Sequence, residues 1–347
     1  MSVRRIAAVA MTGLLVAFAS ACGDDEESSG SGSESASTTA SDKPAIKVGL
    51  VTDIGGLNDR SFNQLANTGL EEAKKELGVE TRVITSKSNA DYVPNLQSLV
   101  QQKYDLIIAV GFLMAEATET VAKKFPNSKF AIIDSSAEGM KSKPANVSGL
   151  LFKEAEAGYL AGYLAGLYAK DNGADTVSSV GGQKIPPVDG YIAGYQAGAK
   201  AANPSIKTLN GYSQDFVDQA KCKEIALSQI ERGSAIVFQV AGQCGLGALD
   251  AAKQEKKLGI GVDADQGYLG AHIITSAMKR IDTAVVAEVK KVQDGSFAGG
   301  KDEIFDIKSD GVGLGKISGD GTKYQAQLDK VQQQLAAGEI DVPTTVK

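Results

Sequence analysis

The sequence predicts an α/β protein made of two similar lobes, each a doubly wound parallel sheet, and three observations support this class. The chain has 347 residues, a length that suits two domains better than one. From Ile46 onward, short apolar segments alternate with amphipathic helical segments, as expected when helices cover both faces of a parallel sheet. The alternation is interrupted near residue 150 and then restarts, so we expect two successive α/β units.

The first unit opens with a strand at 46–53. A helix is expected from Phe62 to Leu77, because apolar residues recur there at helical spacing, with Ser61 as N-cap and Gly78 as the C-terminal stop. The other elements expected in this unit are strands at 81–85, 104–111 and 129–134 and helices near 91–102 and 115–124.

The second unit follows a strand at 147–152 and a helix rich in small residues. That helix carries Gly158, Gly162 and Gly166, which let a neighbouring backbone approach closely. Strands are then expected at 176–182, 206–212, 235–242 and 258–263, with helices at 188–201, 217–232 and 245–256. Late segments at 272–295 and 303–318 are expected to cross back. The predicted division is 46–152 with about 272–320 for lobe 1, 153–271 for lobe 2, and 321–347 for a C-terminal helix and tail.

The N-terminus has the pattern of an exported, lipid-anchored protein. Arg4 and Arg5 precede an apolar run that is too short to span a membrane, which is typical of a secretory signal over residues 1–21. The run ends in Ala-Ser-Ala-Cys22, which resembles the lipobox of bacterial lipoproteins, whose cysteine is acylated. Residues 22–45 are expected to be an acidic Ser/Gly tether. We therefore expect palmitate-type lipidation at Cys22 on the extracytoplasmic face of a bacterial membrane. The alternative is an ordinary signal followed by a chance cysteine.

Composition excludes several function classes. The net charge is −6, which argues against nucleic acid as a partner. A single histidine, His272, and the absence of close His/Cys spacing argue against a metal site. No G-x-S-x-G nucleophile motif and no complete nucleotide-phosphate motif occurs. We expect neither an enzyme nor a cofactor.

Polar and aromatic residues instead follow the ends of predicted strands. Ligands of open α/β sheets bind outside the carboxyl ends of the strands, so these positions are candidates for binding. Each residue taken alone could also be a turn, a helix cap or a core anchor. The candidates are Asp53, Asn58, Ser61, Phe62, Asn63, Asp134, Phe216, Gly242 and Asp263.

Several motifs together resemble the basic-membrane-protein family of lipoproteins. They are TDIGGLNDRSFNQ, FKEAEAGYLAGYLAG, FQVAGQCGLGALDAAK, IGVDADQ and TSAMKRID. The resemblance implies the type I periplasmic-binding-protein fold, with two lobes joined by three crossovers. It also implies the substrate-binding component of an ABC importer that captures a nucleoside, with a purine favoured, and works with permease subunits as a monomer. Another flat or sugar-like ligand, or a membrane-tethered ligand sensor, remains an alternative.

The resemblance also implies residue roles. The base would stack between Phe62 and Phe216, Asp53 and Asp134 would accept its N–H groups, and Asn63 would donate and accept. Asp263 and Lys279 would bind the ribose hydroxyls.

Two cysteines remain once Cys22 is assigned to the lipid. Cys222 lies in the first turns of a predicted helix, and Cys244 follows the next strand, so both fall at one sheet edge. In an oxidising compartment we expect a Cys222–Cys244 disulfide, and two buried free thiols are the alternative.

Overall fold

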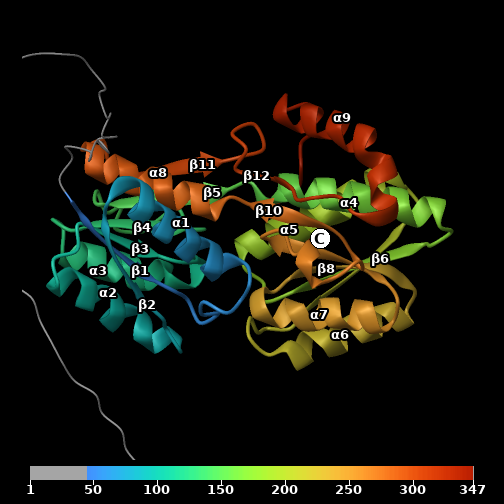
Figure 1. Cartoon of the computed structure of the whole chain (residues 1–347), viewed down its shortest axis with the longest axis horizontal. Coiled ribbons are helices and arrows are strands. Elements are labelled where there is room, and N and C mark those ends of the chain that lie inside the picture. The colour runs from blue at the N-terminus through green and yellow to red at the C-terminus, as the bar shows by residue number, and fades with distance from the viewer. Residues whose placement is uncertain (1–44, 347) are drawn as a thin grey trace, which may run out of the picture. The chain divides into compact units, whose positions relative to one another are not determined.

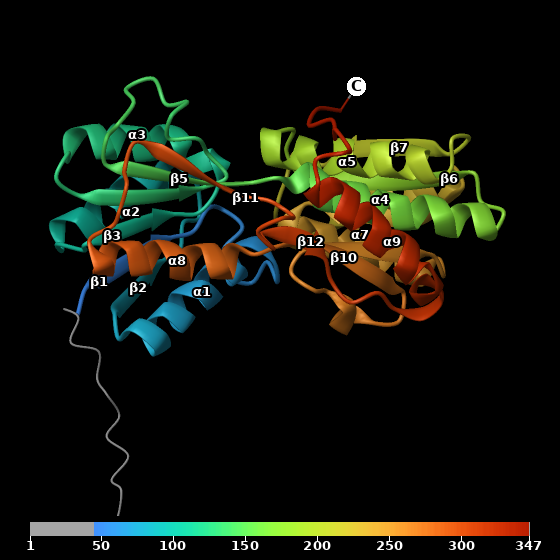
Figure 2. The same ribbon diagram turned by 90° about the horizontal axis from the view of Figure 1, so that it is seen from above.

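Two six-stranded β-sheets, each covered by helices on both faces, form the two lobes in a computed structural model (Figures 1 and 2). The structure describes residues 45–346, which belong to one compact unit. The predicted signal segment, Cys22 and nearly all of the predicted tether lie outside the described residues.

The first sheet has the strand order β11-β5-β4-β3-β1-β2, and all its strands are parallel. Ile107 and Ala109 pack with residues of α2 and α3, whereas Leu106 and Ile108 pack with residues of α1 and α8. This alternation follows from the two-residue repeat of a strand buried on both faces. The elements are β1 (Lys47–Val51), α1 (Phe62–Leu77), β2 (Glu80–Ile84), α2 (Tyr92–Gln101), β3 (Leu106–Ala109), α3 (Ala115–Lys124), β4 (Lys129–Ile133), β5 (Val147–Phe152), α8 (Ile281–Asp294) and β11 (Lys301–Phe305).

The second sheet has the order β12-β10-β9-β8-β6-β7, with β12 antiparallel to β10 and the other pairs parallel. α4 and α5 cover one face, and α6 and α7 cover the other. The elements are α4 (Glu154–Asp171), β6 (Thr176–Gly181), α5 (Pro186–Ala202), β7 (Lys207–Tyr212), α6 (Gln219–Glu231), β8 (Ser234–Val240), α7 (Gly242–Gln254), β9 (Leu258–Asp263), β10 (Ile273–Lys279), β12 (Val312–Leu314) and α9 (Gln325–Ala336).

Helix α1 ends as predicted but is capped differently. Gly78 has a left-handed φ of 68° and its N–H donates to the carbonyl of Lys74, as expected for a glycine stop. The side chain of Ser61 makes no cap hydrogen bond. The Asp59 carboxylate instead accepts the backbone N–H groups of Ser61, Asn63 and Gln64. The cap of α1 therefore comes from Asp59, two positions before Ser61, and its carboxylate is used to bind the N–H groups at the helix start.

The close approach predicted for the helix with small residues is present between α4 and α5. A Cβ added at Gly162 would lie 1.9 Å from the Tyr195 carbonyl oxygen, and one at Gly198 would lie 2.0 Å from that of Tyr159. Alanine at either position would force the two helices apart. This pair of helices is the rigid backing of the second sheet.

The chain passes between the lobes three times. β5 leads into α4 at Lys153, β10 leads into α8 at Arg280, and β11 returns to β12 through residues 306–311. The backbone N–H of Lys153 donates to Phe305 O at 2.9 Å, and that of Arg280 donates to Gly311 O at 2.9 Å. The three connecting segments therefore form one hydrogen-bonded hinge.

This arrangement corrects the predicted lobe boundary near residue 272. β10 pairs with β9 in the second sheet, so the chain returns to lobe 1 only after Lys279. β12 also belongs to the second sheet, so lobe 1 gains only α8 and β11 from the late segments. The apolar sequence of residues 273–279 is compatible with a strand in either sheet. Tertiary packing determines which strand it pairs with, and the sequence pattern does not show this.

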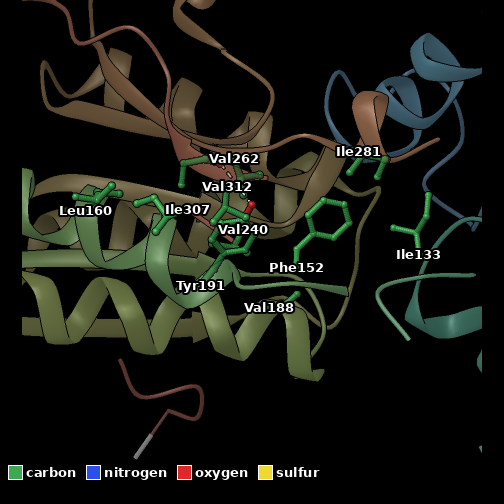
Figure 3. Packing of buried hydrophobic residues seen from close by; sticks show 14 of the residues in the cluster. Ile133, Phe152, Leu160, Val188, Tyr191, Val240, Val262, Ile281, Ile307 and Val312 are labelled. Carbon is green, nitrogen blue, oxygen red and sulfur yellow. Dashed lines mark hydrogen bonds between the residues drawn. The ribbon is translucent and has the colours of Figure 1, made fainter. Parts of the chain in front are cut away.

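One hydrophobic cluster continues through the hinge. Figure 3 shows Phe152 between Ile133 and Ile281 on the lobe 1 side and Tyr191 and Val240 on the lobe 2 side. The Phe152 ring also stacks on Phe305 from the neighbouring crossing, at 5.0 Å between centroids. Apolar packing thus supports the hinge from within.

Short 3₁₀ turns complete the described chain, and α9 packs on α4 near the C-terminal tail (Figure 2). Across residues 45–346, no helix is long and apolar enough to cross a membrane. The 3₁₀ turns are η1 (Asn89–Asp91), η2 (Phe112–Met114), η3 (Gly267–Leu269) and η4 (Gly319–Tyr324).

Candidate functional site

A cleft lies between the lobes at the carboxyl ends of both sheets. The space between its walls is about 610 Å³ when the open solvent at its mouth is included. The predicted residues that line it are Asp53, Phe62, Asn63, Asp134, Phe216, Gly242, Asp263 and Lys279.

Two predicted residues lie elsewhere. Asn58 lines a separate groove together with His272 of lobe 2. Ser61 is fully buried, and its hydroxyl has no hydrogen-bond partner among the described residues. Neither side chain lines the cleft, because neighbouring residues of one loop point in different directions and the motif alone does not give those directions.

The lobe 1 wall of the cleft is a linked set of two carboxylates and one amide. The Asn63 side-chain N–H₂ donates to Asp53 Oδ1 at 2.8 Å and to Asp59 Oδ2 at 3.0 Å. Asn63 Oδ1 accepts the backbone N–H of Asp53 at 3.2 Å, and Asp53 Oδ1 also accepts the N–H of Gly55 at 2.8 Å. All three side chains are at most 8% exposed. The wall is therefore preorganised by its own hydrogen bonds.

A buried lysine occupies the hinge end of the cleft. Lys279 Nζ donates to both carboxylate oxygens of Asp134, at 2.9 and 2.8 Å, and to Glu154 Oε1 at 2.9 Å. Asp134 comes from lobe 1, whereas Glu154 begins α4 of lobe 2. The Lys279 ammonium also lies 5.3 Å from the centre of the Phe62 ring. This ion triad joins the lobes beneath the cleft.

The lobe 2 wall presents Asp263 at the end of β9. The Tyr191 hydroxyl, on α5, donates to Asp263 Oδ1 at 3.2 Å. Asp263 and Asp134 both have left-handed φ values, of 60° and 64°, at equivalent strand ends. Such backbone geometry is uncommon outside glycine and is associated with functional sites.

Carboxylates outnumber cations in this cleft. Burial raises the pKa of Asp53 to about 6 and that of Asp263 to about 7. Burial likewise raises the pKa of Glu154 to about 7 and that of Asp134 above its usual range, although Lys279 opposes both shifts. Burial alone would lower the pKa of Lys279, but its carboxylate neighbours hold it above the usual range. The cleft thus favours ligands that donate hydrogen bonds.

These shifts predict an unusual dependence of stability on pH. The folded protein holds protons on Asp53, Glu154 and Asp263 at pH values where the unfolded chain has lost them. Folding is therefore favoured as the pH falls toward 6, and Lys279 stays charged throughout this window. Between pH 6 and pH 8 we expect the free energy of unfolding to decrease by roughly 1–3 kcal/mol, measured by urea titration. Glu154→Gln should show a weaker decrease, and a rise with pH would contradict the assignment.

One aromatic ring from each lobe borders the cleft. Phe62 opens α1 in lobe 1, and Phe216 lies in the loop between β7 and α6 in lobe 2. Glycines make room for both rings: a Cβ at Gly111 would lie 3.2 Å from Phe62 Cε1, and one at Gly182 would lie 2.3 Å from Phe216 Cε1. Both phenylalanines are half-buried and line the same cleft. A flat ligand could contact one ring from each side.

The disulfide lies next to the Phe216 loop. Cys222 and Cys244 are bonded, as the sequence analysis expects. Cys244 lies in the first turn of α7, and its backbone N–H donates to Phe216 O at 3.0 Å. Asp215 accepts the N–H groups of Val217 and Asp218. The loop that carries Phe216 is thereby held on both sides.

Several lining residues were not among the predicted ones. Tyr191 is one of them, and it falls inside a helix that the sequence predicts. The spacing of Pro187, Val188 and Tyr191 at i, i+1 and i+4 at the start of α5 is the signal that could have placed them on one face. In residues 45–346, no cluster of three or more His, Cys, Asp or Glu side chains is arranged to hold a metal ion.

Comparison with known proteins adds to this geometry. A family model described as "ABC transporter substrate-binding protein PnrA-like" (Bmp) matches residues 46–346. An uncharacterized lipoprotein of Pyrococcus abyssi is 36% identical over 304 residues, which cover 84% of this chain and 74% of that protein. The ABC transporter nucleoside-binding protein BmpA of Lactococcus lactis subsp. cremoris is 34% identical over 333 residues, covering 90% and 93%.

Solved structures show the same architecture. A solute-binding protein of an ABC transporter system from Aeropyrum pernix K1 has a TM-score of 0.78 and 28% sequence identity. The match covers 87% of this chain and 94% of that one. The two parallel-sheet lobes seen here are therefore those of ABC transporter solute-binding proteins.

Proposed function

Because the chain belongs to the PnrA-like (Bmp) family of ABC transporter substrate-binding proteins, we propose that its cleft captures a nucleoside, with a purine favoured. Members of this family bind solutes for ABC transporters and are not enzymes. The BmpA relative is named as nucleoside-binding, which supports this choice of ligand.

The main support for nucleoside binding is the pair of phenylalanine rings in the cleft. Phe62 and Phe216 come from different lobes and line one cleft, so closing the lobes brings a ring to each face of a flat base. Stacking contributes about 1–3 kcal/mol per base in nucleic-acid-binding proteins. A sugar without an aromatic base would not use this pair.

The carboxylates divide between the two ends of the ligand. We assign Asp53, with Asp134 behind it, to the base, and Asp263 to the ribose hydroxyls. Lys279 directs its N–H groups at Asp134 and Glu154, so it supplies positive charge beside the ribose and holds these carboxylates. Asn63 and Gly242 shape the walls. A wrongly filled cleft would leave these buried carboxylates unpaired, which is costly.

We further propose that Cys22 is lipidated and that the protein works as a monomer on the extracytoplasmic face of the membrane, delivering its ligand to permease subunits. Relatives named as lipoproteins support the anchor. Cys22→Ala should release the protein from membranes into the soluble fraction without changing ligand affinity. Retention of this variant in the membrane fraction would contradict the anchor.

Calorimetric titration tests the ligand assignment. The chain from Lys43 onward should bind at least one purine nucleoside, and Phe62→Ala should weaken binding by about 1–3 kcal/mol because the ring no longer stacks. Phe297→Ala is a matched control, since Phe297 is half-buried but does not line the cleft. The absence of heat and of a thermal shift with every nucleoside would defeat the proposal.

A further inference from the structure

The N–H and O–H groups of the polar side chains in the cleft are already used within the protein. Both N–H groups of the Asn63 amide are directed at carboxylates, and Lys279 Nζ has three carboxylate oxygens within 2.9 Å. The Tyr191 hydroxyl is directed at Asp263. What these side chains leave for a ligand is acceptor capacity.

The orientation of the Asn63 amide is dictated by its neighbours. Turning the amide over would place Asn63 Oδ1 against the carboxylate oxygens of Asp53 and Asp59, and Nδ2 against the backbone N–H of Asp53. Both contacts would be repulsive. Asn63 therefore cannot offer an N–H to a ligand without breaking a buried hydrogen bond.

Asp53 has one oxygen that is committed and one that is not. Oδ1 accepts from Gly55 and Asn63. Oδ2 has no hydrogen-bond partner among residues 45–346, and it lies 3.1 Å from where a Cβ of Gly111 would be, on the cleft surface. Asp53 is 8% exposed, so solvent satisfies this oxygen poorly. Among the lobe 1 carboxylates that line the cleft, only Asp53 therefore keeps an oxygen without a partner in residues 45–346.

We propose that Asp53 makes the site selective for purine nucleosides whose base edge donates hydrogen bonds, so that guanosine binds most tightly, inosine next and adenosine least. The inference rests on the proposed function and specifies its substrate class. Guanine presents N1–H and N2–H side by side, and both can be directed at Asp53 Oδ2. Hypoxanthine presents only N1–H. Adenine presents N6–H beside the N1 lone pair, which meets no side-chain donor on this wall because Asn63 is committed.

The preference for guanosine should depend on whether Asp53 is protonated. A neutral Asp53 could donate its O–H to adenine N1 and accept from N6–H, so the preference for guanosine should narrow at acidic pH. Burial raises the pKa of Asp53 to about 6, which places the change in an accessible range. The titratable groups that face Asp53 are Asp59 before α1, Asp134 after β4 and Tyr92 of α2, with Lys279 of β10 paired to Asp134. At pH 8, Asp53 is ionised and selectivity should be greatest.

The substitution Asp53→Asn makes an opposite prediction. The N–H groups of Gly55 and Asn63 would hold the new amide with its oxygen in the place of Oδ1. The amide N–H₂ would then face the cleft in the place of Oδ2. A donor there suits adenine N1 and opposes guanine N1–H, so the order of affinities should reverse. Asparagine pairs with the N6/N7 edge of adenine in DNA complexes, and the N1/N6 edge offers the same combination of one acceptor and one donor.

The experiment is calorimetric titration of the full chain in detergent micelles at pH 8 and pH 5.5, with guanosine, inosine, adenosine and 1-methylguanosine. At pH 8 we expect guanosine to bind about 10- to 100-fold more tightly than adenosine. 1-Methylguanosine, which lacks N1–H, should lose most of this advantage. Asp53→Asn should favour adenosine, whereas the matched control Asp320→Asn, at an exposed position outside the cleft, should keep the wild-type order.

The outcomes separate this inference from the proposed function. Equal or tighter binding of adenosine at pH 8 overturns the selectivity assigned to Asp53 and leaves nucleoside binding intact. Failure of every nucleoside to bind overturns both. If Asp53→Asn does not fold, the comparison of guanosine with 1-methylguanosine on the unaltered chain decides, and equal affinities would overturn the inference.

Discussion

Replacement of Lys279 by methionine is expected to lower the free energy of unfolding by about 3–5 kcal/mol at pH 8, measured by urea titration. The lysine is 1% exposed, and its ammonium pairs with Asp134 and Glu154, which are themselves buried. Removing it leaves two carboxylates without their cation in a site that water hardly reaches. Methionine keeps most of the volume, so the loss reports charge rather than a cavity.

Two comparisons identify the cause of that loss. Lys207→Met removes an ion pair of the same 2.8 Å length at the surface, where Lys207 and Asp175 are 70% and 67% exposed, and should change the free energy of unfolding far less. Adding Asp134→Asn and Glu154→Gln to Lys279→Met should restore much of the lost stability. Lowering the pH to 6 should do the same, because the carboxyls then take up protons. A loss independent of pH and of these additions would contradict the electrostatic explanation.

Removal of the Cys222–Cys244 disulfide should lower the free energy of unfolding by about 3 kcal/mol. The bond closes a loop with a sequence separation of 22. This cross-link lowers the conformational entropy of the unfolded chain, and the size of that loss gives the expected magnitude. The measurement is urea unfolding of Cys222→Ala/Cys244→Ala against the wild type, each with and without dithiothreitol. The reductant should destabilise the wild type and leave the double variant unchanged.

The same variant should also bind ligand more weakly. Cys244 holds the Phe216 carbonyl through its backbone N–H, so freeing the start of α7 loosens the loop that carries the ring. Mass spectrometry of the unreduced protein provides an independent check, since two alkylatable thiols in residues 45–346 would contradict the disulfide.

The sequence predicts that Asp53, Asp134 and Asp263 lie at the carboxyl ends of strands, and in the structure all three line the cleft. Each of these residues ends a short apolar strand, and parallel strands bring their carboxyl ends to one edge. The lining of one cleft by Phe62 and Phe216 also agreed with the family resemblance.

What could not be read from the sequence depends on direction or on distant partners. Asn58 and Ser61 lie just before Phe62, the first residue of α1, yet they do not line the cleft. The pairing of β10 with β9 depends on packing across the second sheet. The sequence of an apolar strand does not show which strand it will pair with. Only the interatomic distances show that the Asn63 amide N–H groups are already bound to Asp53 and Asp59. In the sequence, the same asparagine could equally well bind a ligand.

The three passages between the lobes also constrain how the protein can acquire its structure during synthesis. β11 completes one edge of the first sheet and β12 completes one edge of the second, and both come from residues 301–314. Neither lobe can be finished while the N-terminal portion alone has been made, although domains usually fold in the order of their synthesis. A C-terminal truncation before residue 301 would remove an edge strand from both sheets, so it would not spare the first lobe.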